Sequence, residues 1–185
     1  RKALSFIKSY HIERIGVHNV ELNLSVKQGE SPSFTSKILQ LLEDYQIDPD
    51  LINLEITETN SLRSKESLHQ NMKRLEEHGL SFSLDDFGSG SSNMNYIIDM
   101  PVSIVKLDRL LTEEYSDNNK AKAIVNAVVE MAHSMDIKII AEGIENEAEF
   151  NAMKEIGVDF IQGFYFSKPL PEHEFLRFMQ THNLK

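Results

Sequence analysis

The chain contains no cysteine among its 185 residues. This absence excludes disulfide bonds, cysteine nucleophiles and zinc sites built from thiolates, and it fits a reducing compartment. Long apolar runs are also missing, and none approaches the roughly 18 residues that indicate a membrane-spanning helix. We therefore expect a cytoplasmic segment without membrane contact, although a parent protein could carry an anchor elsewhere. The seven histidines form no H-x-H or H-E-x-x-H spacing, so no histidine metal site is expected.

Positive charge is scarce relative to negative charge. The chain has 19 lysines and arginines against 29 aspartates and glutamates, which gives a net charge of −10. This balance argues against binding of a nucleic-acid polymer, which needs a basic face. An anionic small ligand would need local cations or metal ions to offset the field of the protein. The hydrophobic share of 41% and the charged share of 26% are ordinary for one globular domain with a buried core.

Strand and helix patterns alternate along the whole chain. Alternating or apolar runs predict strands over 20–25, 52–58, 80–85, 102–108, 137–142 and 159–164. Helical patterns lie between them, and the longest, over 117–135, has the apolar stripe Ile124, Val128, Met131 and Met135. Such alternation predicts a parallel sheet with crossover helices, either an open doubly wound sheet or a barrel. A G-x-G-x-x-G fingerprint, usual in doubly wound dinucleotide folds, is absent.

The two faces of the predicted strands differ, and this difference favours a barrel. An open sheet covered on both sides should be apolar on both faces, but here one face is apolar and the other turns polar towards the strand end. In a barrel the polar face points inward near the mouth. The inward residues at the strand ends would be Asn23, Glu55, Asp85, Lys106, Glu142 and Gln162. Buried charges need partners, and a hard cation held by three carboxylates and an amide would supply one.

The stretch from Asp85 to Gly90 places two adjacent carboxylates before a loop with two glycines. Taken alone, it is equally consistent with a solvated aspartate pair that caps a helix. Strand alternation predicts that Asp85 points into the barrel. We expect Asp86 to begin the loop and to face another direction, where it would serve a second metal ion.

The chain resembles the EAL domain, the bacterial cyclic-di-GMP phosphodiesterase family. Six motifs occur in the family's order and spacing: Asn23-Leu24-Ser25, Glu55-Ile56-Thr57-Glu58, Asp85-Asp86-Phe87-Gly88-Ser89-Gly90, Lys106-Leu107-Asp108-Arg109, Ala141-Glu142-Gly143-Ile144-Glu145 and Gln162-Gly163-Phe164-Tyr165-Phe166-Ser167-Lys168-Pro169. The resemblance implies a modified (β/α)8 TIM-type barrel that hydrolyses cyclic-di-GMP to pGpG with Mg²⁺ or Mn²⁺, in a site of two ions.

The resemblance also implies a set of metal ligands. The ligands of the first metal are Asn23, Glu55 and Asp85. Asp86 is expected to reach the second metal, and Asp85 to bridge the two. Only oxygen atoms are offered, which favours Mg²⁺ or Mn²⁺ over zinc.

The remaining roles follow from the same resemblance. Lys106 would orient the attacking water or stabilise charge, and Glu142 would act as general base or as a further ligand. Gln162 would lie in the substrate site. Glu58 would anchor the glycine loop, and Glu145 would support the site. The expected partners are cyclic-di-GMP, a second copy of the chain, and a diguanylate cyclase or sensor domain upstream.

The sequence departs from the family pattern in two ways. The glutamate of the motif that names the family is absent, and six strands are counted where the barrel has eight. We therefore expect residues 1–185 to be an EAL-type domain that lacks its N-terminal strands. The family usually has an aromatic residue after the second glycine of the loop, where this chain has Ser91.

Two other functions stay open. The first alternative is a catalytically inactive EAL-like module that binds cyclic-di-GMP or a protein partner as a regulatory receptor. The second is an unrelated barrel enzyme with a carboxylate-bound Mg²⁺.

Overall fold

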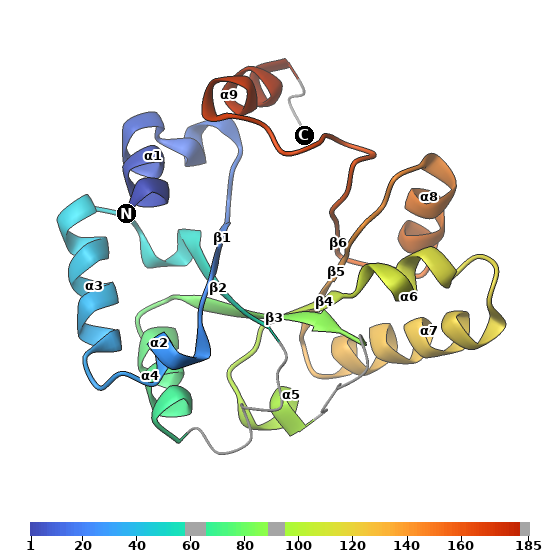
Figure 1. Cartoon of the computed structure of the whole chain (residues 1–185), viewed down its shortest axis with the longest axis horizontal. Coiled ribbons are helices and arrows are strands. Elements are labelled where there is room, and N and C mark those ends of the chain that lie inside the picture. Colours follow the sequence, from blue (N-terminus) through green and yellow to red (C-terminus); the bar gives the residue numbers. More distant parts are fainter. Residues whose placement is uncertain (58–65, 89–94, 182–185) are drawn as a thin grey trace.

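One curved sheet of six parallel strands forms the centre of the molecule (Figure 1). The computed structural model describes residues 1–57, 66–88 and 95–181. Strand order follows chain order, β1-β2-β3-β4-β5-β6. The strands are β1 (Val20–Asn23), β2 (Ile52–Thr57), β3 (Ser81–Phe87), β4 (Ile104–Leu107), β5 (Lys138–Ala141) and β6 (Phe160–Ile161). The predicted parallel sheet with crossover helices is confirmed, and the sheet curves as part of a barrel does.

Helices cover the outer, convex side of this sheet (Figure 1). The described helices are α1 (Lys2–Tyr10), η1 (Ile12–Ile15), α2 (Val26–Gly29), α3 (Phe34–Tyr45), η2 (Pro49–Leu51), α4 (Glu66–Glu76), α5 (Asn95–Asp99), α6 (Arg109–Glu114), α7 (Asn119–Ser134), α8 (Glu147–Glu155) and, on the concave side instead, α9 (Glu172–Thr181). The sequence analysis missed α6, which begins directly after β4. Asp108 starts this helix, because its Oδ1 accepts a hydrogen bond of 2.8 Å from the backbone N–H of Leu110.

Polar residues on the inner face of the sheet confirm the expected alternation. Asn53 and Ser83 are fully buried, and the Ser83 hydroxyl donates to Asn53 Oδ1 at 2.7 Å. Asn53 Nδ2 donates in turn to Ser81 Oγ at 2.9 Å. Because Asn53 and Ser83 are hydrogen-bonded to each other, and Asn53 also to Ser81, their burial on the inner face is compensated.

The apolar face of the strands packs on the helices. Leu68, Met72 and Leu75 of α4 are fully buried there. For α7 the predicted stripe is partly wrong, because Ile124 and Met135 are 50% and 40% exposed. The buried residues of α7 are Ala121, Val125, Val128, Val129 and Ala132. A shift of one residue turns a helix by about 100°, and the small alanines let the shifted face approach the sheet.

The sixth strand is shorter than predicted. Only Phe160 and Ile161 pair with β5. A Cβ atom on Gly163 would lie 1.9 Å from the carbonyl oxygen of Ile144, so the chain leaves the sheet and passes closely over Ile144. The backbone N–H of Tyr165 then donates to that carbonyl at 2.9 Å.

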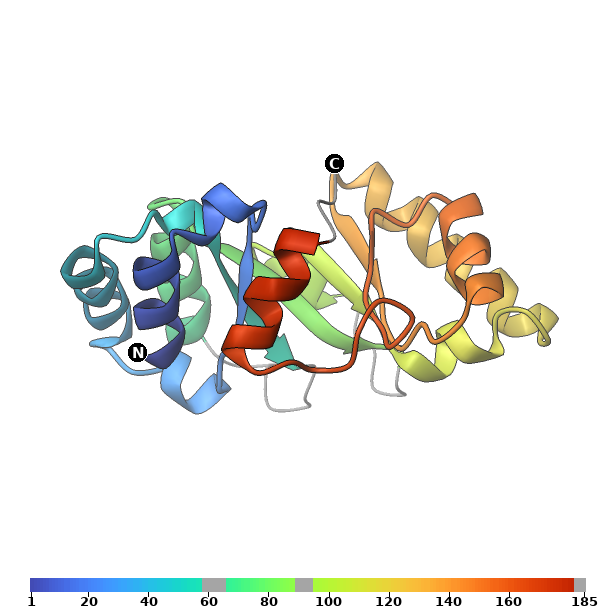
Figure 2. The ribbon, with the colours of Figure 1, turned by 90° about the horizontal axis from the view of Figure 1, so that it is seen from above.

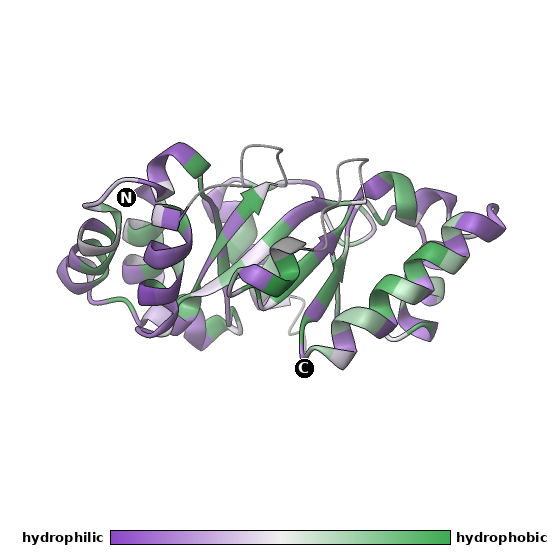
Figure 3. Cartoon of the chain, turned by 90° about the horizontal axis from the view of Figure 1, so that it is seen from below, coloured by the Kyte–Doolittle hydropathy of each residue, from purple (hydrophilic) through white to green (hydrophobic). Residues whose placement is uncertain are grey.

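The last helix lies across the concave side between α1 and the β5–β6 side of the sheet (Figure 2). The ring of Phe175 in α9 is 6.0 Å from that of Phe6 in α1, so the first and last described helices are in contact. Figure 3 shows many hydrophilic turns in the helices at the N-terminal end and mainly white and green turns along the long helix α7 at the other end. Among the described helices, none combines the length and the apolar character that crossing a bilayer requires.

Candidate active site

A buried lysine and four carboxylates meet at the end of the sheet where the strands finish. The side chain of Lys106, on β4, is only 4% exposed. Its Nζ lies 2.8 Å from Glu55 Oε1 and 2.8 Å from Glu142 Oε1. Glu21 Oε2 and Asp85 Oδ1 are each 3.5 Å away. The sequence analysis brought Glu55, Asp85, Lys106 and Glu142 to one barrel mouth, and the structure places them in contact.

A β-bulge in β3 brings a further carboxylate to this group. Leu84 pairs with Val105 and Phe87 pairs with Leu107, so Asp85 and Asp86 together oppose Lys106. Asp86 adopts a φ of 55°, in the left-handed region. The expectation that Asp86 begins the loop is wrong, because β3 continues to Phe87; its role toward a second metal stays a prediction. The bulge interrupts the alternation on which that expectation rested.

Three carboxylates of this group are spaced as ligands of one cation would be. One oxygen from each of Asp85, Asp86 and Glu142 lies within 4.8 Å of the other two. Among residues 1–57, 66–88 and 95–181, Asp85 Oδ1 and Glu21 Oε1 are buried and find no hydrogen-bond partner. Buried carboxylate oxygens that lack donors, next to other carboxylates, fit a hard divalent cation.

The burial of these acids changes their ionisation. Burial raises the pKa of Glu55 to about 7, with Asp85 adding to the rise and Lys106 reducing it. Burial also raises the pKa of Glu142 and that of Asp86, where the neighbouring Asp85 adds to the effect. Burial opposes the charge on Lys106, but hydrogen bonds to Glu142 and Glu55 outweigh it and raise the lysine pKa. The site therefore holds more acid than one ammonium group can balance.

Glu21 is a member of this group that the sequence analysis did not select. It lies on β1, on the same strand face as the selected Asn23. The alternation along the strand could have identified it, but Asn23 was chosen because it stands at the strand end. Asn23 pairs with Glu55 in the sheet register and is exposed at the end of β1. Among the described residues, Lys106 Nζ donates a hydrogen bond to Glu55 and none to Asn23.

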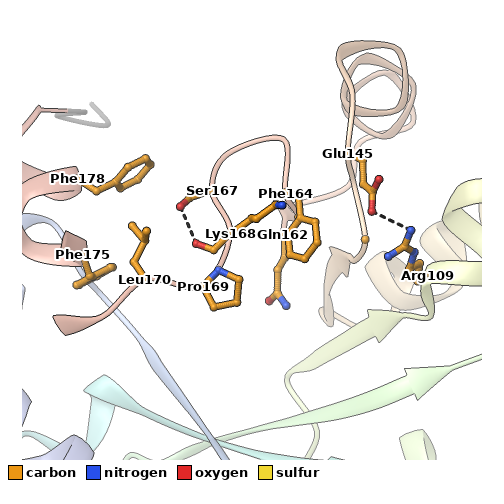
Figure 4. A pocket seen from close by; sticks show the side chains of 12 residues that line it. Arg109, Glu145, Gln162, Phe164, Ser167, Lys168, Pro169, Leu170, Phe175 and Phe178 are labelled. Atoms are coloured by element: carbon orange, nitrogen blue, oxygen red, sulfur yellow. Dashed lines mark hydrogen bonds and ion pairs between the residues drawn. The ribbon is translucent and has the colours of Figure 1, made fainter.

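The other selected residues lie beside the acidic group or outside the described chain. A cavity of about 400 Å³ lies beside this group and is lined by Gly143, the residue after Glu142. Figure 4 shows Arg109 and Glu145 paired on one side of it, Gln162 near the middle, and Phe175 and Phe178 of α9 opposite. The ion pair between Arg109 and Glu145 measures 2.8 Å. Glu58, the predicted anchor of the glycine loop, lies outside the described residues.

Comparison with known proteins gives consistent matches. A family model described as the EAL domain matches residues 1–169. The cyclic di-GMP phosphodiesterase RocR of Pseudomonas aeruginosa is 30% identical over 158 residues, which make up 85% of this chain and 40% of RocR. The chain thus spans about two fifths of the length of that relative.

Two solved structures share this architecture. The P. aeruginosa MucR phosphodiesterase in complex with c-di-GMP matches with a TM-score of 0.84 at 28% identity, over 94% of this chain and 70% of the other. The Klebsiella pneumoniae BlrP1 complex with manganese and cyclic-di-GMP matches with a TM-score of 0.82 at 25% identity, over 92% of this chain and 43% of the other.

Proposed function

Because the chain belongs to the EAL domain family, we propose that it carries a metal-dependent phosphodiesterase site that hydrolyses cyclic-di-GMP to the linear dinucleotide pGpG. The observation that carries the proposal is the contact of Lys106 with Glu55 and Glu142, beside the paired aspartates of the β3 bulge. The substrate class is supported by RocR, named for this activity, and by MucR, solved with this dinucleotide.

The metal ligands proposed are Asn23, Glu55, Asp85 and Asp86, which would hold one or two Mg²⁺ or Mn²⁺ ions. The acid group fits such ions, since its ligand atoms are oxygens and two of them are buried with no hydrogen-bond partner in the part of the chain that the structure describes. When bound, the metal would lower the pKa of a coordinated water and offset charge on the phosphate. The manganese in the BlrP1 complex is consistent with this choice of ion.

Two side chains of the site would handle the proton and the developing charge. Glu142 would accept the proton of the attacking water, and burial raises its pKa, which makes its carboxylate a stronger base than an exposed one. A lysine has three N–H donors, and Lys106 uses two on Glu55 and Glu142. The third would meet a phosphate oxygen. The water oxygen bonds to phosphorus, one bridging P–O bond breaks, and the released oxygen takes up a proton.

The neighbouring cavity would receive part of the dinucleotide. Gln162 lies in its wall and would contact the substrate. Glu145 would support the site by holding Arg109 at the edge of the cavity. The assignment of Glu58 to the glycine loop stays a prediction, as do a homodimer and an upstream cyclase or sensor domain.

The test is hydrolysis of cyclic-di-GMP by the full-length protein with Mn²⁺, followed by chromatography of pGpG. Replacing a general base costs about 10²- to 10⁴-fold in rate, so we expect that loss in kcat for Glu142→Gln. Glu147→Gln is the control, because Glu147 follows closely in the chain but is exposed in the first turn of α8. Its kcat should match that of the wild type.

Two results would contradict these assignments. Absence of pGpG with the wild type would exclude the hydrolysis, and cyclic-di-GMP binding without hydrolysis would support the regulatory receptor instead. An unimpaired Glu142→Gln variant would remove Glu142 from the reaction.

A further inference from the structure

A buried hydroxyl from α6 reaches the backbone of Glu142. Thr112 is 1% exposed. Its Oγ1 lies 2.6 Å from the carbonyl oxygen of Glu142 and 2.9 Å from that of Arg109. A hydroxyl has one proton to donate, and the shorter distance assigns it to Glu142.

Glu142 stands where the sheet stops defining the backbone. Ala141 is the last residue of β5 in register, paired with Leu107 and Ile161. Gly143, one residue beyond Glu142, has a φ of 73° and has therefore left the strand conformation. Thr112 donates its hydrogen bond to the carbonyl of Glu142, which lies between Ala141 and Gly143.

One short segment, residues 106–112, contacts both the side chain and the backbone of Glu142. Lys106 of β4 meets the Glu142 carboxylate at 2.8 Å, and Thr112, six residues later, meets its carbonyl. Asp108 lies between Lys106 and Thr112 in the chain, and it caps α6 directly after β4. Arg109 packs against Gly143 so closely that a Cβ atom there would lie 2.4 Å from the arginine side chain.

We propose that Thr112 is a positioning residue for Glu142: its hydroxyl fixes the backbone at the end of β5, so that the carboxylate stays in line with Lys106. The inference rests on the proposed phosphodiesterase function for its kinetic consequence. Displacement of a reacting group by about 1 Å can cost around a hundredfold in rate, so even a partial loss of this restraint is measurable.

The test compares Thr112→Val, Thr112→Ser and Tyr115→Phe in the full-length protein. Valine keeps the branched shape but removes the donor, and serine keeps the donor. Tyr115 is the matched control, since it is buried at the end of the same helix and its hydroxyl bonds Asn126 Oδ1 at 3.1 Å, away from Glu142. The measurements are kcat and KM for cyclic-di-GMP with Mn²⁺, and amide hydrogen exchange of a peptide covering 141–145.

For Thr112→Val we expect kcat to fall about tenfold with KM within about twofold of the wild type, and exchange over 141–145 to quicken. Thr112→Ser should restore both, and Tyr115→Phe should change neither. If Thr112→Val behaves like Tyr115→Phe in both measurements, the inference is overturned. If exchange quickens but the wild type makes no pGpG, the proposed function fails and the positioning of Glu142 stands.

Discussion

Lys106 is a buried cation surrounded by an excess of acid. Its Nζ contacts Glu21, Glu55, Asp85 and Glu142 within 3.5 Å, and its side chain is almost completely enclosed. Removing one partner of a buried ion pair leaves charge uncompensated and is strongly destabilising. The structural role of this lysine can therefore be measured separately from its role in catalysis.

We expect Lys106→Met to lower the free energy of unfolding by about 3–5 kcal/mol in EDTA, because four carboxylates then face one another without a cation. Mn²⁺ should recover more stability in this variant than in the wild type. Urea unfolding with EDTA and with Mn²⁺ measures both effects. Lys138→Met is the control: Lys138 pairs with Asp159 at 2.8 Å but is 59% exposed, and exposed pairs contribute little to stability. Equal stability of Lys106→Met and wild type in EDTA would refute the expectation.

Strand alternation predicted most single residues of the site. It placed Glu55, Asp85, Lys106 and Glu142 on the inner face, because the alternation holds along β2 and β4, along β3 up to the bulge, and along β5 up to Ala141, directly before Glu142. It could not decide whether Glu21 or Asn23 reaches Lys106, since alternation assigns both to one face of β1 but does not say how far along the strand the site lies. The reach of Lys106 from β4 to Glu21 on β1 depends on the curvature of the sheet, which no local pattern specifies.

Among the elements, β3 differs most from its pattern. The bulge at Asp85–Asp86 sets two carboxylates against one lysine and requires a left-handed residue at position 86. Aspartate and asparagine tolerate this conformation better than alanine does. Position 86 therefore has two separate requirements: a residue that tolerates a positive φ, and a carboxylate beside Lys106.

We expect Asp86→Ala to cost about 1–2 kcal/mol of unfolding free energy and Asp86→Asn much less. Both should weaken Mn²⁺ binding, because both remove the carboxylate. Asp136→Ala is the matched control, since Asp136 has a φ of 58° in the exposed turn before β5. It should lose similar stability with unchanged Mn²⁺ affinity. Urea unfolding and calorimetric titration would distinguish the two effects, and unchanged Mn²⁺ affinity in Asp86→Asn would exclude Asp86 as a ligand.

Periodicity in the sequence predicted most strands and helices. It failed where a contact with a residue distant in sequence sets the end of a strand or the buried face of a helix. The strand at 159–164 is cut short by the close approach of Gly163 to Ile144. On α7 the sheet selects the alanine-rich face over the one with larger side chains. The short helix α6 is too brief to show a helical period, and its capping by Asp108 was the signal available in the sequence.

At the scale of the whole molecule, acid burial links stability to pH. The pKa of Glu55 is about 7 in the folded state against an ordinary 4.5. Between these values the folded state keeps a proton that the unfolded state has lost. The stability gained from this group is therefore complete below pH 4.5 and is lost as the pH rises through 7.

We expect the metal-free wild type to lose about 1–3 kcal/mol over this pH range relative to Glu55→Gln, which does not titrate. Mn²⁺ should reduce the loss at the upper end, because ligand carboxylates bind metal only when ionised. Unfolding of both proteins in EDTA from pH 4.5 to 8 checks the prediction. Parallel stability curves for the two proteins would show that burial does not perturb Glu55.

The order of the six strands has a consequence for synthesis on the ribosome. Each strand pairs with the one made just before it, so the sheet can be laid down from β1 onwards as the chain emerges. Glu21, Glu55 and Asp85 then emerge from the ribosome before Lys106 does. Of the five residues in contact here, the acids from β1 to β3 emerge first, Lys106 follows with β4, and Glu142 follows directly after β5.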